Sequence, residues 1–332
     1  MNKSNHPEVN FGKTGILIIN LGTPDSTGWW DIRKYLKEFL SDRRVIEVNP
    51  FIWQIILNIF ILTFRPAKTA HAYKKIWLKK ENESPLLYYT RAQKNGLKAK
   101  IETKNVIIDF AMRYGNPSIK SKLKFLQENG CEKIIILPLY PQYAAATTAT
   151  VCDEVYRSLM KMRWQPSLQI IPHYESDPLY IKALVNSIKN KIEKINWKPE
   201  LIIASYHGIP QSYFDKGDPY QCYCQKTTRL IKEQFTNIEI KTTFQSRFGP
   251  QEWLKPYTDK TLDDLPKQGI KNVLVICPGF ASDCVETLEE INIQGKESFL
   301  KHGGINFDLI PCLNENPDHI HLFETLVKRY LI

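Results

Sequence analysis

Short apolar runs alternate with longer amphipathic segments along most of the chain. The runs carry few polar residues, which is typical of strands that are buried on both faces of a sheet. Such strands are expected at residues 15–21, 106–113, 133–138, 168–172, 201–206, 238–245, 271–277 and 305–310. Helices are expected at residues 30–40, 117–128, 147–162, 177–195, 223–235, 258–266, 283–300 and 316–330. Because strands and helices alternate so regularly, we predict an α/β fold of parallel sheets with helices on both faces.

The chain of 332 residues exceeds what one hydrophobic core ordinarily holds, so we expect two domains. The strand–helix pattern divides around residues 172–180, which places a first domain at residues 1–175 and a second at residues 176–332. Neither a GxGxxG motif nor a P-loop follows any expected strand, so the sequence gives no support to a nucleotide site.

Residues 51–64, FIWQIILNIFILTF, interrupt this pattern because nearly all of them are apolar. Basic residues flank the segment, with Arg44 before it and Arg65 and Lys68 after it. The segment is too short to span a bilayer, which needs roughly 20 apolar residues. It is therefore either a buried core helix or an apolar lip that dips into a membrane surface, with its basic flanks at the headgroups.

The composition indicates a globular protein with an anionic partner. Hydrophobic residues make up 43% of the chain and charged residues 24%, and the net charge is +10. Nucleic acid is not favoured as the partner, because the sequence has no zinc-finger spacing, RNP-like motif or arginine-rich arm. The seven cysteines are scattered and several lie in apolar runs, so we expect buried free thiols in a reducing compartment.

Several expected strands end in residues that suit ligand binding. His207 follows the strand at 201–206, at the sheet edge where open α/β sheets bind their ligands. Arg113 and Tyr114 close another strand, where Arg113 is either a carboxylate anchor or half of a surface salt bridge. Tyr140 follows a third strand in a proline-containing loop and can form one wall of a site for a flat ligand.

Glu286 and Glu290 lie four residues apart in the helix expected at 283–300, and therefore on one face of it. The helix dipole favours acidic residues near a helix start, which explains Glu286 alone. A like-charge pair at this spacing is destabilising on an ordinary surface. A second interpretation therefore stands beside the first: carboxylates that face a cavity opposite His207 can bind a divalent cation or relay protons.

These features occur together in one known family, and the sequence resembles a ferrochelatase of the bacterial type. A ferrochelatase inserts ferrous iron into protoporphyrin IX to give protohaem, with release of two protons. The matching stretches run in order from about residue 12 to residue 325, at residues 15–24, 113–114, 140–143 with 147–148, 205–210, 217–220, 245–250, 253–254 with 258–259, and 280–290.

The resemblance implies two similar Rossmann-like domains, the chelatase fold, with the porphyrin bound in the cleft between them. It implies His207 as the metal ligand or proton acceptor, Glu286 as its partner at the metal, and Glu290 as the continuation of an acidic path. The porphyrin-binding residues implied in the same way are Leu21, Arg113, Tyr114, Tyr140, Trp253, Phe280 and Asp283. The substrates are then protoporphyrin IX and ferrous iron. The segment 51–64 becomes a peripheral contact of a cytoplasmic enzyme with the inner membrane.

The sequence also departs from the animal ferrochelatases. Gly208 replaces a serine and Cys284 a histidine, so neither is given the role of the side chain it replaces. Ala145 stands where the animal enzymes have an iron–sulphur ligand, so we expect no [2Fe–2S] cluster and no other cofactor. Leu21 stands where coproporphyrin-using relatives tend to have tyrosine, which favours protoporphyrin. The alternatives are a chelatase for another tetrapyrrole, such as coproporphyrin, and a membrane-surface haem or porphyrin carrier without turnover.

Overall fold

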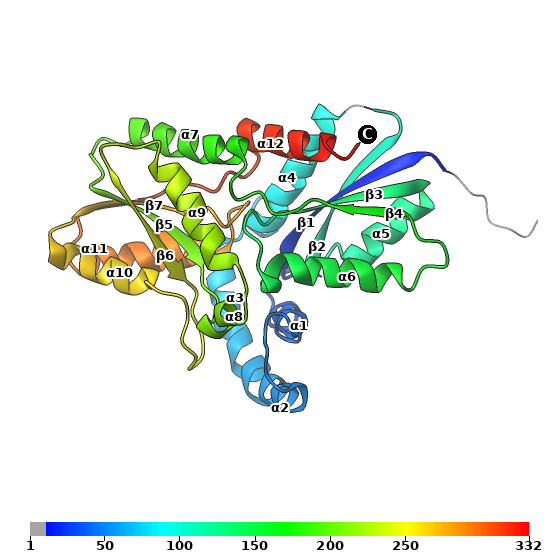
Figure 1. The fold of residues 1–332 in the computed structure, drawn as a ribbon. Helices are drawn as coiled ribbons and strands as arrows, with labels where there is room; N and C mark the ends of the chain where they lie inside the picture. The colour runs from blue at the N-terminus through cyan, green and yellow to red at the C-terminus, as the bar shows by residue number, and fades with distance from the viewer. Residues whose placement is uncertain (1–10, 102, 332) are drawn as a thin grey trace, which may run out of the picture.

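The computed structural model of the protein describes residues 11–101 and 103–331. Its strands form two sheets of four parallel strands each, in the orders β2-β1-β3-β4 and β6-β5-β7-β8 (Figure 1). The first sheet contains β1 (Lys13–Thr23), β2 (Val106–Gly115), β3 (Cys131–Pro138) and β4 (Ser167–Ile170). The second contains β5 (Leu201–His207), β6 (Glu239–Gln245), β7 (Asn272–Ile276) and β8 (Asn306–Leu309). Every strand expected from the sequence is present, and the predicted α/β class with two parallel sheets is confirmed.

The inner strands are buried on both faces, which is why they lack polar alternation in the sequence. In β1, Ile16 and Ile18 join one hydrophobic cluster, whereas Leu17 and Ile19 join another on the opposite face. The cluster around Ile16 also contains residues of the second sheet, such as Ile202. The two sheets therefore share one core, and the proposed division at residue 175 stays a prediction.

Helices cover both sheets and connect their strands. They are α1 (Trp29–Leu40), α4 (Pro85–Lys100), α5 (Ile119–Glu128), α6 (Thr150–Leu159), α7 (Pro178–Lys194), α8 (Gln211–Asp215), α9 (Tyr220–Lys232), α10 (Thr258–Asp264) with a short 3₁₀ turn η3 (Leu265–Gln268), α11 (Lys296–Lys301) and α12 (Pro317–Lys328). The sequence pattern does not predict α4, because its buried face carries the polar Thr90 and Gln93 beside Leu86 and Leu97. The last helix, α12, lies against α7 and α4 and so joins the two halves of the molecule (Figure 1).

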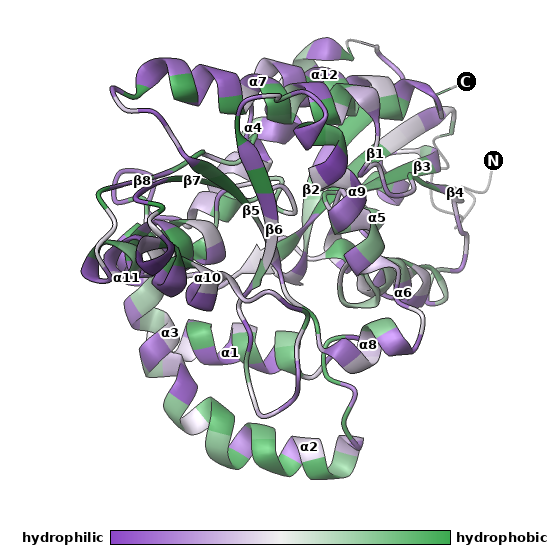
Figure 2. Cartoon of the chain, turned by 60° about the vertical axis from the view of Figure 1, so that its left-hand side comes forward, coloured by the Kyte–Doolittle hydropathy of each residue, from purple (hydrophilic) through white to green (hydrophobic). Residues whose placement is uncertain are grey.

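The apolar segment belongs to one long helix, Pro50–Ile76, formed by α2 (Pro50–Ile56), the π-helix η1 (Leu57–Ile61) and α3 (Leu62–Ile76). The prediction that residues 51–64 are too short to span a bilayer applies to this segment alone, because the helix that contains it has 27 residues and is long enough by length and composition. The second half of this helix was not predicted because it contains many polar residues. Its buried residues are nevertheless spaced as in a helix: Leu62, Pro66, Ala70, Tyr73 and Ile76. The first half of the helix projects from the rest of the molecule and carries mostly hydrophobic residues (Figure 2).

Two helices that were expected to be regular begin as π-helices, in which hydrogen bonds join residues i and i+5. η2 (Ala145–Ala149) leads into α6, and η4 (Glu286–Gly295) leads into α11. π-Helices are rare in proteins, and those that occur often lie at functional sites. Both lie beside the cavity described below, since Thr147 and Glu286 are among its lining residues.

Candidate active site

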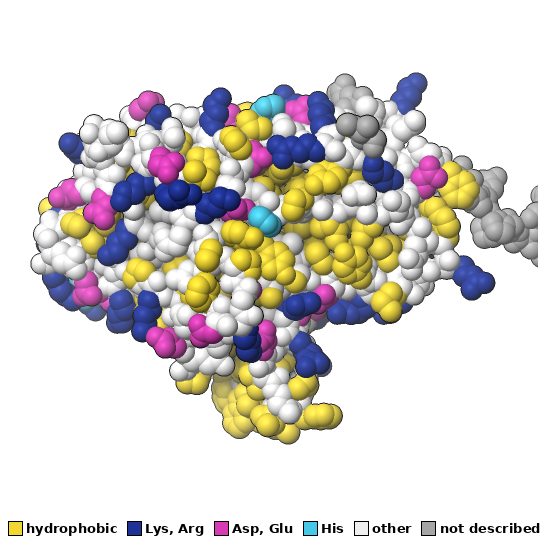
Figure 3. Space-filling model, in the orientation of Figure 1, with side chains coloured by type: hydrophobic (Ala, Val, Ile, Leu, Met, Phe, Trp, Pro, Cys, Tyr) yellow, Lys and Arg dark blue, Asp and Glu magenta, His cyan; other side chains and the backbone are white. Residues whose placement is uncertain are grey.

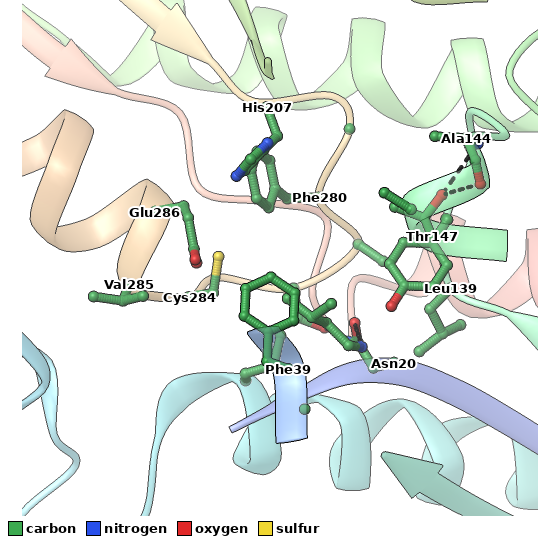
Figure 4. Close-up of a pocket in the computed structure, with 18 of the residues that line it drawn as sticks. Asn20, Phe39, Leu139, Ala144, Thr147, His207, Phe280, Cys284, Val285 and Glu286 are labelled. Atoms are coloured by element: carbon green, nitrogen blue, oxygen red, sulfur yellow. Dashed lines mark hydrogen bonds between the residues drawn. The ribbon is translucent and has the colours of Figure 1, made fainter. Parts of the chain in front are cut away.

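A cavity that is partly open to solvent lies where the carboxyl ends of the two sheets meet. It is lined by Asn20 and Leu21 of β1, Leu139 directly after β3, His207 at the end of β5 and Gly279 after β7. Open α/β folds bind their ligands at this edge. Most of the lining is apolar or aromatic, with few polar groups, as is usual for a site that encloses a small molecule (Figure 4).

His207 presents one ring nitrogen to this cavity. Its Nδ1 lies 2.6 Å from the carbonyl oxygen of Gly208. Because a carbonyl oxygen only accepts hydrogen bonds, Nδ1 carries a hydrogen, and the neutral form of the ring has its lone pair on Nε2. The ring lies between two aromatic walls of the cavity, with its centroid 6.4 Å from that of Trp253 and 6.5 Å from that of Phe280. His207 is thus built to accept a proton or bind a metal ion.

Glu286 and Glu290 lie on η4 in different surroundings. Glu286 lines the cavity on the side where His207 and Cys284 lie (Figure 4). Glu290 is half-buried, and its carboxylate accepts hydrogen bonds from the backbone nitrogen of Ser246, at 2.7 Å, and from the Ser246 hydroxyl. Burial raises the pKa of Glu290, the Ser246 hydroxyl and His207 oppose that rise, and the Glu286 carboxylate adds to it. These mutual effects on the pKa of Glu290 indicate that the three predicted catalytic groups form one electrostatic cluster.

Comparison with known proteins identifies the family. The family model described as Ferrochelatase matches residues 13–331. Curated ferrochelatases from Allorhizobium ampelinum and Agrobacterium fabrum are 54% and 53% identical, each over 99% of this chain and 96% of the relative. One from Francisella tularensis is 51% identical over 96% of each chain. The chain belongs to the ferrochelatase family. It is therefore an enzyme, a metal-chelating lyase of haem biosynthesis.

The fold is also shared with chelatases of distant sequence. A solved structure described as SirB from Bacillus subtilis with Fe³⁺ has a TM-score of 0.60 and 13% identity, and it aligns over 96% of this chain and 95% of that one. At such low identity the likeness shows the fold alone. It supports the chelatase fold that was expected for this member of the family.

Four of the predicted porphyrin-binding residues line the cavity. Leu21 and Tyr140 line the cavity from the first half of the chain, and Trp253 and Phe280 line it from the second. The Tyr140 hydroxyl is buried and has no hydrogen-bond partner among the described residues. Their contact with porphyrin stays a prediction.

Arg113 and Tyr114, which were also predicted to bind the substrate, are not among the residues that line this cavity. The Arg113 guanidinium is buried, donates to the Thr150 carbonyl oxygen at 2.9 Å and forms an ion pair with Asp42. Tyr114 is fully buried and donates to the same Asp42 carboxylate at 2.9 Å. Its ring packs behind the cavity-lining Phe39, with centroids 5.0 Å apart. A buried arginine needs a counter-charge, which Asp42 supplies to Arg113, and a role of Arg113 at the substrate stays a prediction.

The Asp283 carboxylate is likewise hydrogen-bonded within the protein and does not line the cavity. Its carboxylate accepts hydrogen bonds from Asn314 Nδ2 at 2.8 Å, from Thr287 Oγ1 at 3.1 Å and from the Cys312 backbone nitrogen at 3.2 Å. These bonds fix the turn that precedes η4. Asp283 therefore stabilises the start of η4.

Several cavity residues escape prediction from the sequence. Tyr35 and Phe39 of α1 and Tyr73 and Ile76 of α3 line the cavity. Burial raises the pKa of the Tyr35 and Tyr73 hydroxyls, and the Glu286 carboxylate raises both further. In the sequence these aromatic and aliphatic residues follow the period of an ordinary core helix, and no signal distinguishes them from it.

The thiols and carboxylates do not form a ready-made metal centre. Among residues 11–101 and 103–331, no group of three or more His, Cys, Asp or Glu side chains could hold a metal ion. All seven cysteines lie in this part of the chain and are free thiols, and Cys284 is one of the cavity residues. The assignment of His207 and Glu286 as metal ligands stays a prediction, as does the expectation of no cofactor.

Proposed function

We propose that this chain inserts ferrous iron into protoporphyrin IX in the cavity between the two sheets and releases two protons. The observation that carries the proposal is His207, whose free Nε2 faces a cavity with aromatic walls and a carboxylate on the same side. A porphyrin must lose both pyrrole protons as the metal enters, so the site needs a neutral base beside the ring. Imidazole meets this need near physiological pH and also binds iron.

The carboxylates of η4 extend this chemistry away from the ring. Glu286 is the first acceptor for a proton passed on by His207, and Glu290 lies next along the path. A carboxyl whose pKa is raised by burial holds a proton at a pH closer to neutral than an exposed glutamate does. Glu290 therefore suits the transient storage of a proton during turnover.

The walls of the cavity favour a flat apolar substrate. Leu21 and Tyr140 on one side and Trp253 and Phe280 on the other offer apolar surface to the two faces of a macrocycle. Leu21 adds no polar group to the wall, which suits protoporphyrin IX better than the more carboxylated coproporphyrin. Ferrous iron enters as a substrate, and we expect no resident cofactor.

We also propose that the enzyme is cytoplasmic and binds the inner membrane peripherally. Among the described residues, the helix Pro50–Ile76 is long and apolar enough to cross a membrane by length and composition alone, and 17% of its most apolar stretch of 18 residues is buried. If the whole helix crossed the bilayer, Leu62, Ala70 and Tyr73 would have to leave the hydrophobic core. Shallow insertion of α2 and η1 into the membrane surface leaves that core intact and therefore costs less free energy. Hydrophobic side chains cover the projecting end of this helix (Figure 3).

The decisive experiment is anaerobic porphyrin consumption with His207→Ala. Wild type should lose protoporphyrin fluorescence over time once ferrous iron is added, whereas His207→Ala should fold normally and lose nearly all turnover. His71→Ala is the matched control, because His71 is exposed on α3 and does not line the cavity. Substantial turnover in His207→Ala would contradict the assignment. An immediate fluorescence shift in wild type without further consumption would instead indicate a carrier.

A further inference from the structure

Glu289 lies between the two predicted catalytic carboxylates in sequence but has a different environment. Its residue exposure is 4%, and its carboxylate lies 2.9 Å from Lys75 Nζ and 2.6 Å from Gln294 Nε2. Lys75 is on α3, and 35% of its side chain is exposed. A buried carboxylate is tolerated only when it is paired, so Lys75 supplies the charge that permits Glu289 to be buried.

The two elements that this ion pair joins both contribute to the cavity. The end of α3 that carries Lys75 also carries Tyr73 and Ile76, which line the cavity wall. η4 carries Glu286, whose carbonyl oxygen accepts a hydrogen bond from Gln245 Nε2 at 2.8 Å. The π-helix is therefore held on one side by the second sheet and on the other by Lys75.

We propose that Lys75 is a positioning residue: by neutralising the buried Glu289 carboxylate, it holds η4 in the register in which Glu286 and Glu290 meet His207. The inference rests on the proposed function of these carboxylates. A π-helix is a rare backbone form, so its register needs support from contacts outside the helix. Without Lys75, Glu289 is a buried charge with only an amide partner. A rotation of η4 that brings Glu289 to water relieves this and displaces its neighbours Glu286 and Glu290.

The two partners differ in exposure, so their loss should have unequal effects. Lys75→Met leaves an uncompensated buried carboxylate, whereas Glu289→Gln leaves a lysine that can turn toward solvent and a neutral amide that can still pair with Gln294. We expect kcat to fall about tenfold or more in Lys75→Met and to change less than about threefold in Glu289→Gln. The double variant should recover most of the lost kcat, because it contains no unpaired buried charge. Porphyrin affinity should change by less than about twofold throughout, since neither side chain lines the cavity.

The experiment combines kinetics with hydrogen exchange of the full chain. Exchange over residues 286–295 should accelerate in Lys75→Met and return toward wild type in the double variant with Glu289→Gln. Lys74→Met is the matched control, since it removes the same charge from an exposed neighbour on the same helix. Lys75→Arg should keep wild-type kcat.

The outcomes separate this inference from the proposed function. If Lys75→Met matches wild type in both kcat and exchange, or the second substitution restores neither, the pair does not position η4. If exchange responds as expected while wild type shows no metal insertion, the proposed function is wrong and the link between α3 and η4 remains. If Lys75→Met does not fold, hydrogen exchange over residues 286–295 is compared among wild type, Lys75→Arg and the double variant. Exchange in the double variant that stays much faster than in wild type would contradict the inference.

Discussion

At the scale of single residues, the different surroundings of Glu286 and Glu290 predict different kinetic effects. Glu286 lines the cavity, so Glu286→Gln should lower kcat far more than porphyrin affinity. Glu290→Gln should cost less, because water can replace the outer member of a relay. The raised pKa of Glu290 also predicts that this variant loses an acidic limb of the pH–rate profile that lies above the usual glutamate range. Anaerobic steady-state kinetics across pH measures both effects.

Glu289→Gln belongs in the same series as the reference variant. Its side chain contacts Lys75 and Gln294 and does not line the cavity. If Glu289→Gln proved the most damaging of the three, the assignment of roles along η4 would be wrong.

His319 predicts a pH dependence of stability that is separate from catalysis. It is fully buried, its Nδ1 donates to the Asn314 carbonyl oxygen at 2.8 Å, and burial lowers its pKa from 6.5 to about 4. Between these values the unfolded chain binds a proton that the folded chain does not, so stability falls as the pH drops from about 6.5 toward about 4. At pH 5 this residue should account for a loss of about 2 kcal/mol relative to pH 7.

Urea unfolding at both pH values tests this expectation. His319→Gln should reduce the difference in unfolding free energy between pH 7 and pH 5, whereas His71→Gln, on an exposed face of α3, should preserve it. An unchanged difference in His319→Gln would show that other groups cause the acid sensitivity.

At the scale of elements, the helix Pro50–Ile76 predicts that its two faces respond differently to the same substitution. Ile55 and Ile59 are 59% and 58% exposed, whereas Leu57 is fully buried. Replacing both isoleucines with serine should weaken liposome binding and raise KM for membrane-delivered porphyrin, with little change in Tm. Leu57→Ser should instead lower the free energy of unfolding by at least about 2 kcal/mol, because it empties a buried aliphatic site.

Co-sedimentation with anionic liposomes and thermal unfolding together test whether the exposed isoleucines bind the membrane and the buried leucine stabilises the fold. A large fall in Tm for the Ile55→Ser, Ile59→Ser variant would mean that these side chains are covered in solution. Unchanged liposome binding with an unchanged Tm would leave the helix without a role at the membrane.

The strands and most helices follow from the sequence because their burial imposes a regular pattern. The hydrophobic pattern fails where polar residues interrupt it. Thr90 and Gln93 on the buried face of α4 prevent the prediction of that helix, and the polar residues after Phe64 prevent the prediction of α3. The π-helical form of η4 could not be predicted either, since Glu286 and Glu290 lie on similar faces in both helix types.

Within the site, the sequence predicts which residue types gather at strand ends, but not their partners. His207 and Trp253 are found in the cavity because strand ends and loops converge there. Arg113 has the same kind of position in the sequence, yet it is neutralised by Asp42, a residue far away in the chain. Only the tertiary structure shows which charge is free to meet a substrate.

At the scale of the whole molecule, the loop between α1 and α2 joins the two halves across the cavity. Arg44 pairs with Asp153 of α6 at 2.9 Å, which fixes the loop to the first half. Tyr213 of α8 donates from its hydroxyl to the Val45 carbonyl oxygen and accepts from the Glu47 backbone nitrogen, both at 3.1 Å. Because Val45 and Tyr213 also line the cavity, these bonds close one edge of it.

Tyr213→Phe should therefore open this edge without disturbing the chemistry. The ring remains to line the cavity, but both hydrogen bonds across it are lost, so porphyrin should dissociate several-fold faster while kcat for bound substrate changes little. Tyr156→Phe on an exposed face of α6 is the matched control. Stopped-flow dissociation and single-turnover insertion separate the two steps. If dissociation is unchanged and the chemical step slows instead, Tyr213 acts on the bound porphyrin, and the loop from α1 to α2 does not control access to the cavity.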